Sequence, residues 1–152
     1  MIKIGRKKVE SKKLDGKISF ITGQAETLDM QSESLDLATV TFGIRNFRDL
    51  ETSLKNIHRI LKKDGRLYIL EFSLPKLKLI RAPYLFYFRK VLPWVGNKIS
   101  KHQTAYNYLN KTVESFPYGE QLKTILKDAG FKKVRYTPLT LGIATLYIAQ
   151  KD

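Results

Sequence analysis

The fold is set by residues 35–72, which read LDLATVTFGIRNFRDLETSLKNIHRILKKDGRLYILEF. Residues 35–42 form an almost continuous β-branched and apolar run, which is typical of a parallel strand covered on both faces. Asp49 is a suitable N-cap for a helix with apolar residues at helical spacing, and Lys-Asp-Gly at 63–65 ends that helix. Residues 66–72 predict a second strand. The order strand, helix, strand is the unit that builds a parallel sheet.

The flanking sequence continues this alternation. Residues 2–14 predict a helix, and residues 17–23 alternate as a short strand after Asp15-Gly16. The elements expected downstream are a polar helix near 106–115, a break at Pro117, a helix at 118–129 ended by Gly130, and strands near 132–138 and 142–149. We therefore predict one α/β domain over residues 1–152, with an open, mostly parallel sheet and helices on both faces.

Composition excludes several classes of protein. A chain of 152 residues with 43% hydrophobic and 28% charged residues suits one folded domain, neither disordered nor collagen-like. Because the chain has no cysteine, it has no disulfide scaffold, zinc ribbon or thiol nucleophile, and we predict no metal site. It also has no apolar run of about 18 residues and no signal-peptide pattern, so we expect a cytoplasmic protein.

The formal net charge of +14 is unevenly spread. No acidic residue occurs between Phe72 and Val113, where eight Lys and Arg alternate with apolar and aromatic residues. We call residues 75–101 the basic aromatic segment. Its composition suits single-stranded nucleic acid, through stacking and phosphate contacts, or an anionic membrane surface, through interfacial aromatic residues. A helix with an ordinary core stripe and a solvated lysine-rich face is the third interpretation.

Two predicted strands end in polar loops, and open α/β sheets bind ligands beyond such carboxyl ends. Gln24 after the first strand can pair with an adenine edge, and Thr41 can line the crevice. Arg45 and Asn46 can orient a polar or anionic substrate group, although polar residues end most strands. His102 is a candidate general base or an ordinary surface histidine.

His58, within the amphipathic helix, is interpreted as structural. A glycine-rich turn between a first strand and its helix, followed by an acidic ribose ligand, is not found in this sequence.

These motifs carry a resemblance to a known family. The run TFGIRN at 41–46, the run RILKKDGRL at 59–67 and the following LEFSLP at 70–75 resemble the ubiquinone/menaquinone biosynthesis C-methyltransferases of the UbiE type. Four further motifs follow the same pattern, namely YNYL at 106–109, FP at 116–117, DAGF at 128–131 and LT-x-G at 139–142. The resemblance covers essentially the whole chain and about the last three-fifths of a family member.

The resemblance implies a truncated Rossmann-like class I methyltransferase fold that lacks the first strands, with S-adenosyl-L-methionine as cofactor. By position, Gln24 and Ala25 match the adenine-proximal pair, Gln24 standing where the family has Asp or Asn, and Thr41 matches a cofactor-contacting residue. Arg45 and Asn46 would face a polyprenylated quinol precursor. We assign hypothetical catalytic roles to Arg45, as a phenolate stabiliser, and to His102 and Tyr106, in proton transfer.

Three functions remain open at this point. The first is methylation of the quinol precursor, impaired in this chain alone because the glycine-rich motif is absent, with the basic aromatic segment as a flap peripheral to an anionic membrane. The second is a non-catalytic remnant or accessory subunit that forms a homodimer or complements another subunit. The third, a nucleic-acid-binding module, is least favoured.

Overall fold

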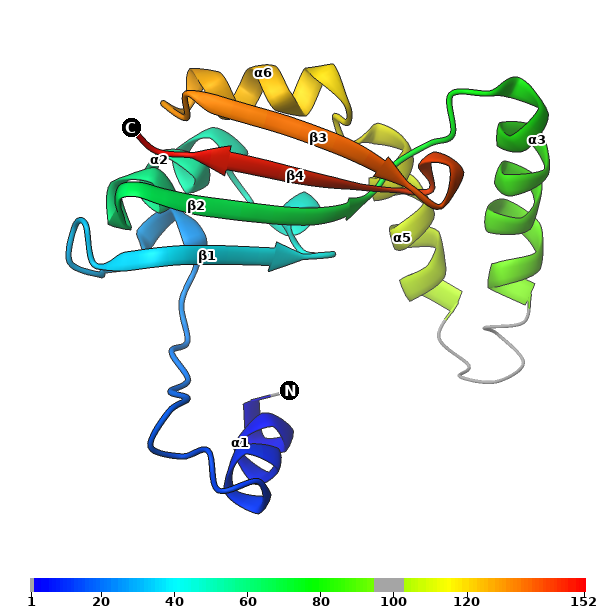
Figure 1. The fold of residues 1–152 in the computed structure, drawn as a ribbon. Helices are drawn as coiled ribbons and strands as arrows, with labels where there is room; N and C mark the ends of the chain where they lie inside the picture. The colour runs from blue at the N-terminus through cyan, green and yellow to red at the C-terminus, as the bar shows by residue number, and fades with distance from the viewer. Residues whose placement is uncertain (1, 95–102) are drawn as a thin grey trace.

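The computed structural model describes residues 2–94 and 103–152. Its four strands form one sheet in the order β1-β2-β4-β3, with β1 at Leu35–Thr41, β2 at Leu61–Phe72, β3 at Lys133–Leu139 and β4 at Ala144–Gln150. β1 pairs with β2 in parallel, and β4 is antiparallel to both of its neighbours. Three strands therefore share one direction, and the predicted α/β fold with a mostly parallel sheet is confirmed (Figure 1).

The helices fall close to their predicted positions. The α-helices are α1 (Ile2–Ser11), α2 (Leu50–Ile60), α3 (Lys78–Phe86), α5 (Gln103–Ser115) and α6 (Glu120–Asp128). A π-helix, η3 (Tyr87–Val91), continues α3, and the 3₁₀ turns are η1 (Ala25–Thr27), η2 (Ile44–Asn46) and η4 (Thr140–Gly142). Asp49 caps α2 as predicted, since its Oδ1 accepts the Thr52 N–H at 3.0 Å.

Two predictions about strands are wrong. Residues 17–23 do not form a strand, because β1 and β3 are the edges of the sheet and no described strand pairs with this segment. β2 begins at Leu61 rather than at residue 66. Residues 63–65, which we expected to separate the helix from the strand, form a kink within β2. Asp64 takes a left-handed φ of 62°, and the pairing with β1 passes directly from Leu61 to Arg66.

The main core lies on one face of the sheet. Helices α2 and α6 lie side by side there (Figure 1), and Leu54 of α2 and Leu126 of α6 share one buried cluster with Leu67, Ile69 and Tyr147 of the strands. Because side chains alternate along a strand, the intervening residues point to the opposite face. We call this opposite side the open face, and its apolar members include the partly exposed Tyr68, Leu70, Leu146 and Ile148 of the central strands and the exposed Leu37 of β1. Within the described residues, α2 and α6 thus cover one of the two faces that we expected helices to cover.

His58 has the structural role expected of it. Its ring meets the Phe131 ring edge-on at 5.0 Å, which joins α2 to the chain that leaves α6. Gly130 adopts a φ of 108°, and a Cβ there would lie 3.2 Å from the His58 ring. Both the left-handed backbone and the close ring therefore require glycine at the end of α6.

A second, smaller core joins the basic aromatic segment to α5. Leu74, Phe88 of η3 and Val113 of α5 are its buried members, and the Tyr84 and Phe88 rings stack with centroids 5.4 Å apart. The inner side of this segment is therefore ordinary core, as one of the three interpretations expected. No helix among the described residues is long and apolar enough to cross a bilayer.

The phenol of Tyr147 is a buried hydrogen-bond acceptor within the main core. Its oxygen accepts the Gly119 N–H at 2.6 Å, which fixes the start of α6 against β4. Burial raises the pKa of Tyr147 to about 12, because the phenolate would lose its hydration. The neutral phenol is therefore part of the folded state well beyond the pH at which an exposed tyrosine ionises.

We expect Tyr147→Phe to lower the free energy of unfolding at pH 8 by about 1–3 kcal/mol, because the Gly119 N–H loses its acceptor. Since the unfolded phenol ionises near pH 10 and the buried folded one near 12, ionisation of the unfolded chain lowers the stability of the wild type above pH 10, a loss that the variant does not share. The difference between wild type and variant should narrow by about 2 kcal/mol between pH 9 and 11.5. Urea unfolding across this range measures it, and a constant difference contradicts the assignment.

Candidate functional site

The carboxyl end of β1 borders an open groove of about 310 Å³. One wall is formed by residues that precede or begin η1, and the other by residues that follow β1. The lining residues are Gly23, Gln24, Ala25, Glu26, Gly43, Asn46, Phe47 and Arg48. The two polar segments that the sequence placed after separate strands therefore converge on one shared groove.

Polar side chains of α2 hold the η1 wall in place. Glu26 Oε1 accepts the Asp49 N–H at 3.0 Å, and this bond lowers the pKa of the Glu26 carboxyl. Asn56 Nδ2 donates to the Ala25 carbonyl at 2.8 Å, and Arg59 Nη1 donates to the Met30 carbonyl at 2.8 Å. The wall thus depends on hydrogen bonds to α2 and its N-cap rather than on pairing within the sheet.

A buried ion pair holds the other wall. The Glu71 side chain, at the end of β2, is 2% exposed, and its Oε1 lies 2.5 Å from Nη1 of Arg45, whose side chain is 10% exposed. Arg45 Nη1 also donates to the Phe42 carbonyl at 2.9 Å, whereas its Nε is buried without a partner in the described residues. The Phe72 N–H donates to Glu71 Oε1 at 2.9 Å. The pair therefore ties η2 to β2 and leaves the buried Nε donor without a partner in the described residues.

The chain turns sharply where β1 ends. Phe42 has a left-handed φ of 51°, a strained conformation for a bulky residue, and its ring stacks on that of Phe72 at 4.4 Å. The Arg45 guanidinium lies 5.6 Å from the Phe72 ring centroid. On the far side of η2, the Tyr108 hydroxyl of α5 donates to Asn46 Oδ1 at 3.1 Å. These contacts fix the direction in which Asn46 faces the groove.

The predicted site residues are only partly brought together. Gln24, Ala25 and Asn46 line the groove. Thr41 is exposed at the end of β1 and is not part of the groove lining, and Arg45 points to Glu71. The backbone of Tyr106 lies in α5, and His102 lies outside the described residues.

The sequence analysis missed the residues that support the groove, namely Glu26, Asn56, Arg59, Glu71 and Tyr108. Glu71 carried a usable signal, since an acid between Leu70 and Phe72 at the end of an apolar strand requires a cationic partner when buried. Asn56 and Arg59 are polar residues on an amphipathic helix and look like any solvated face. Their partners are backbone carbonyls, which no sequence pattern marks.

We expect Glu71→Gln to lower the free energy of unfolding by about 3–5 kcal/mol, because it leaves the Arg45 guanidinium buried without a counter-charge. Urea unfolding measures the loss. Asp36→Asn is the matched control, since Asp36 pairs with Lys62 on the exposed surface, and we expect its effect to stay below about 1 kcal/mol. Equal effects of the two substitutions would contradict the assigned role of the buried pair.

Comparison with known proteins gives concordant results. The chain is 44% identical over 151 residues to the ubiquinone/menaquinone biosynthesis C-methyltransferase UbiE of Geotalea uraniireducens, and 40% identical over 151 residues to the demethylmenaquinone methyltransferase of Bacteroides fragilis. These alignments cover 99% of this chain but only 64% and 62% of the two relatives, so the chain spans less than two thirds of their length.

The fold also matches solved structures. A SAM-dependent methyltransferase from Thermotoga maritima superposes with a TM-score of 0.60 over 92% of this chain and 68% of that one, at 21% sequence identity. At this identity the match concerns the fold alone. The sequence profile of the ubiE/COQ5 methyltransferase family matches residues 1–151. The chain therefore belongs to the ubiE/COQ5 methyltransferase family.

Proposed function

We propose that this chain serves S-adenosyl-L-methionine-dependent C-methylation of a polyprenylated quinol precursor in ubiquinone or menaquinone synthesis. The observation that carries the proposal is the groove, in which Gln24 and Ala25 face Asn46 across the carboxyl end of β1. Ligands of open α/β sheets bind at this end, and the relatives named above are a ubiquinone/menaquinone biosynthesis C-methyltransferase and a demethylmenaquinone methyltransferase.

The groove suits the adenosyl end of the cofactor. The Gln24 amide makes no hydrogen bond within the described residues, so both its donor and its acceptor can pair with an adenine edge. Ala25 contributes a small side chain that leaves room for a planar ring. When bound, S-adenosyl-L-methionine supplies an electrophilic methyl group. Contacts to its methionine end require residues beyond this groove, since the sequence holds no glycine-rich turn, and we expect weak binding by this chain alone.

Arg45 and Asn46 are proposed to hold the quinol. Methylation of a ring carbon needs an electron-rich ring, so a phenolic proton must leave before the carbon bonds to the methyl group. Because Arg45 is neutralised by Glu71, its contribution is an aligned N–H donor rather than net charge. Asn46 Nδ2 is the donor that borders the groove, and the neighbouring Arg45 Nε, which is buried and has no partner in the described residues, supports this wall of η2. His102 and Tyr106 remain candidates for accepting the phenolic proton.

The outer side of the basic aromatic segment is proposed to rest on an anionic membrane, where a polyprenyl tail resides. Leu77, Leu79 and Phe86 are 65%, 88% and 64% exposed, respectively, which is unusual for large apolar residues in a folded chain. Lys78 and Lys90 are exposed on the same helical run and take part in none of the ion pairs found among the described residues. Apolar insertion and attraction to anionic lipid therefore act together.

We expect S-adenosylhomocysteine to bind this chain with a Kd tighter than about 1 mM, measured by isothermal calorimetry. Ala25→Trp should abolish binding because the indole fills the groove, whereas Ala82→Trp, on exposed α3, should leave it unchanged. No binding by the folded wild-type chain would reject cofactor binding. The second candidate, a non-catalytic accessory subunit, would then be favoured, since it needs no glycine-rich turn.

We expect the chain to sediment with vesicles that contain 30% phosphatidylserine and much less with neutral phosphatidylcholine vesicles, as about 1 kcal/mol per surface cation implies. Lys78→Glu combined with Lys90→Glu should reduce the bound fraction at least tenfold. Lys111→Glu combined with Lys127→Glu, on α5 and α6, is the control with the same change in charge. Sedimentation that does not depend on lipid charge would reject the membrane proposal. It would not affect the proposal that the groove binds the cofactor.

A further inference from the structure

The hairpin that joins β3 to β4 ends in a strained and exposed turn. Thr140 and Leu141 of η4 have left-handed φ angles of 47° and 58°, a pair of conformations that tight hairpin turns usually assign to Asn, Asp or Gly. The second of these residues is nevertheless a leucine, and it is 72% exposed. Its backbone strain and its exposure are both unfavourable in water. Stability of the fold therefore does not explain a leucine at this position.

The tip of this hairpin is held against the start of the basic aromatic segment. The Ser73 hydroxyl donates to the Gly142 carbonyl at 2.8 Å. A Cβ on Gly142 would lie 3.3 Å from the Cα of Pro75, so the two backbones are in close contact. Leu141 directly precedes Gly142, and Leu77 follows Pro75 by two residues. The two exposed leucines therefore belong to adjoining segments of backbone.

The tip lies at the edge of the sheet that also carries the groove. β1 and β2 are parallel, and β3 shares their direction because β4 is antiparallel to both β2 and β3. These three strands therefore end at the same edge, with Thr41, Phe72 and Leu139 as their last residues. Figure 1 shows the turn between β3 and β4 at this edge, on the side of α3. A surface that contacts η4 thus meets the edge at which the groove opens.

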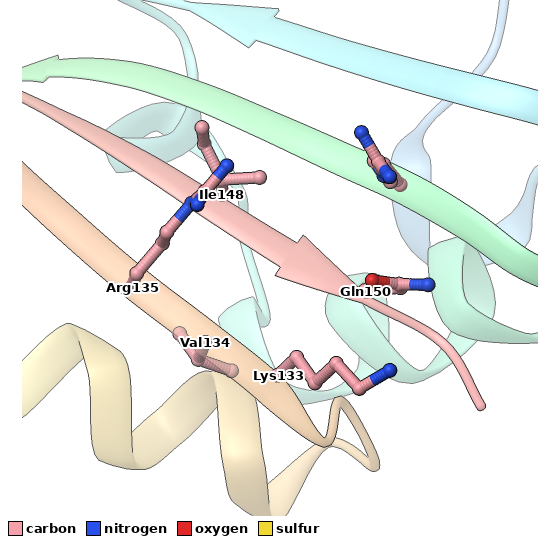
Figure 2. A pocket seen from close by; sticks show the side chains of 6 residues that line it. Lys133, Val134, Arg135, Ile148 and Gln150 are labelled. Carbon is pink, nitrogen blue, oxygen red and sulfur yellow. The ribbon is translucent and has the colours of Figure 1, made fainter.

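The other end of the hairpin has a different character. The strand register aligns Arg66, Gln150 and Lys133 in one row across three strands. Figure 2 shows the side chains of Arg135, Gln150 and Lys133 around a hollow of about 290 Å³ at this end. Among residues 133–150, all of which the structure describes, the large apolar residues that are exposed lie at the tip. The exposed apolar character of the hairpin is therefore confined to the carboxyl edge of the sheet.

The charge around the tip suits an anionic surface. The sequence has no acidic residue from 72 to 113 or from 129 to 151, so neither the hairpin nor the segment that it touches carries a carboxylate. Lys76 and Lys78 are exposed on either side of Leu77, and they take part in none of the ion pairs found among the described residues. Anionic lipid attracts such lysines while neighbouring apolar side chains insert.

We propose that η4 is a preformed membrane-insertion turn, in which the Leu141 side chain enters the apolar region of an anionic bilayer. This inference rests on the membrane contact proposed for α3 and adds a second insertion point to it. The left-handed backbone holds the leucine outward, and burial in lipid removes the exposure that is unfavourable in water. With α3 and η4 both on the bilayer, the carboxyl edge of the sheet faces the lipid, so a polyprenylated quinol has a short path to the groove.

A tryptophan reporter tests whether the turn enters the bilayer. Because Trp94 is the one tryptophan of the chain, Trp94→Phe combined with Leu141→Trp gives a single reporter at the tip. We expect its emission to shift to the blue and to be quenched at least twofold by vesicles of phosphatidylserine and brominated phosphatidylcholine. Trp94→Phe combined with Leu37→Trp is the matched control, since Leu37 is an exposed leucine of β1, and we expect no quenching there.

A second variant, Leu141→Gly, separates insertion from folding. Glycine adopts the left-handed backbone without strain, so the urea midpoint of unfolding should stay unchanged or rise. The Kd for the same vesicles should nevertheless rise about tenfold, because one leucine side chain is no longer buried in lipid. Leu37→Ala, which shortens an exposed leucine elsewhere, should leave this Kd unchanged.

Three outcomes would overturn the role of the turn. One is vesicle binding by the wild-type chain without quenching of the Leu141→Trp reporter, which would leave the contact through α3 in place. Another is equal quenching of the two reporters, which indicates unspecific adsorption. The third is a homodimer that Leu141→Gly dissociates, seen by light scattering, because Leu141 would then belong to a protein interface. Absence of vesicle binding by the wild type would reject both membrane contacts, whereas cofactor binding to the groove is measured separately by calorimetry.

Discussion

Burial of a single sheet face is the constraint on which the rest of this structure depends. Helices α2 and α6 pack side by side on Leu67, Ile69 and Tyr147, and this cluster supplies most of the apolar burial. Because α2 is held there, its exposed edge can fasten the η1 wall through Asn56 and Arg59. The same packing leaves the other face open. The groove and the open face therefore both follow from the way the core is covered.

The Glu71–Arg45 pair has a different role from the core. Its two charges lose hydration on burial, so the pair adds little net stability even though breaking it is costly. The pair instead fixes the orientation of the Arg45 side chain. It connects the end of β2 to the turn that follows β1 and keeps the guanidinium out of solvent. The strained backbone of Phe42 persists under the same restraint. Because this wall of the groove is already ordered, it can present Asn46 to a ligand without a change in conformation.

The surface divides into regions with different chemistry. The outer side of α3 combines exposed aliphatic and aromatic side chains with lysine, and the open face combines a flatter apolar centre with arginine at one end. The first pattern suits a bilayer, because apolar side chains can insert into it and lysine is attracted to its anionic headgroups. In the second pattern the cations are fixed in rows by the strand register. The excess of Lys and Arg in the sequence did not by itself distinguish these two regions.

Local pattern by itself determined the order of elements, the N-cap at Asp49, the structural role of His58 and the two polar loops, because capping and hydrophobic periodicity are short-range properties. Specific motifs determined the family. Only tertiary structure decided that residues 17–23 lack a strand, since a strand exists through its neighbours. It also decided that Arg45 faces Glu71 and that Thr41 lies outside the groove, because partners 26 residues apart meet only when β1 and β2 pair. Long-range pairing, and not residue type, determines which polar side chains meet a ligand.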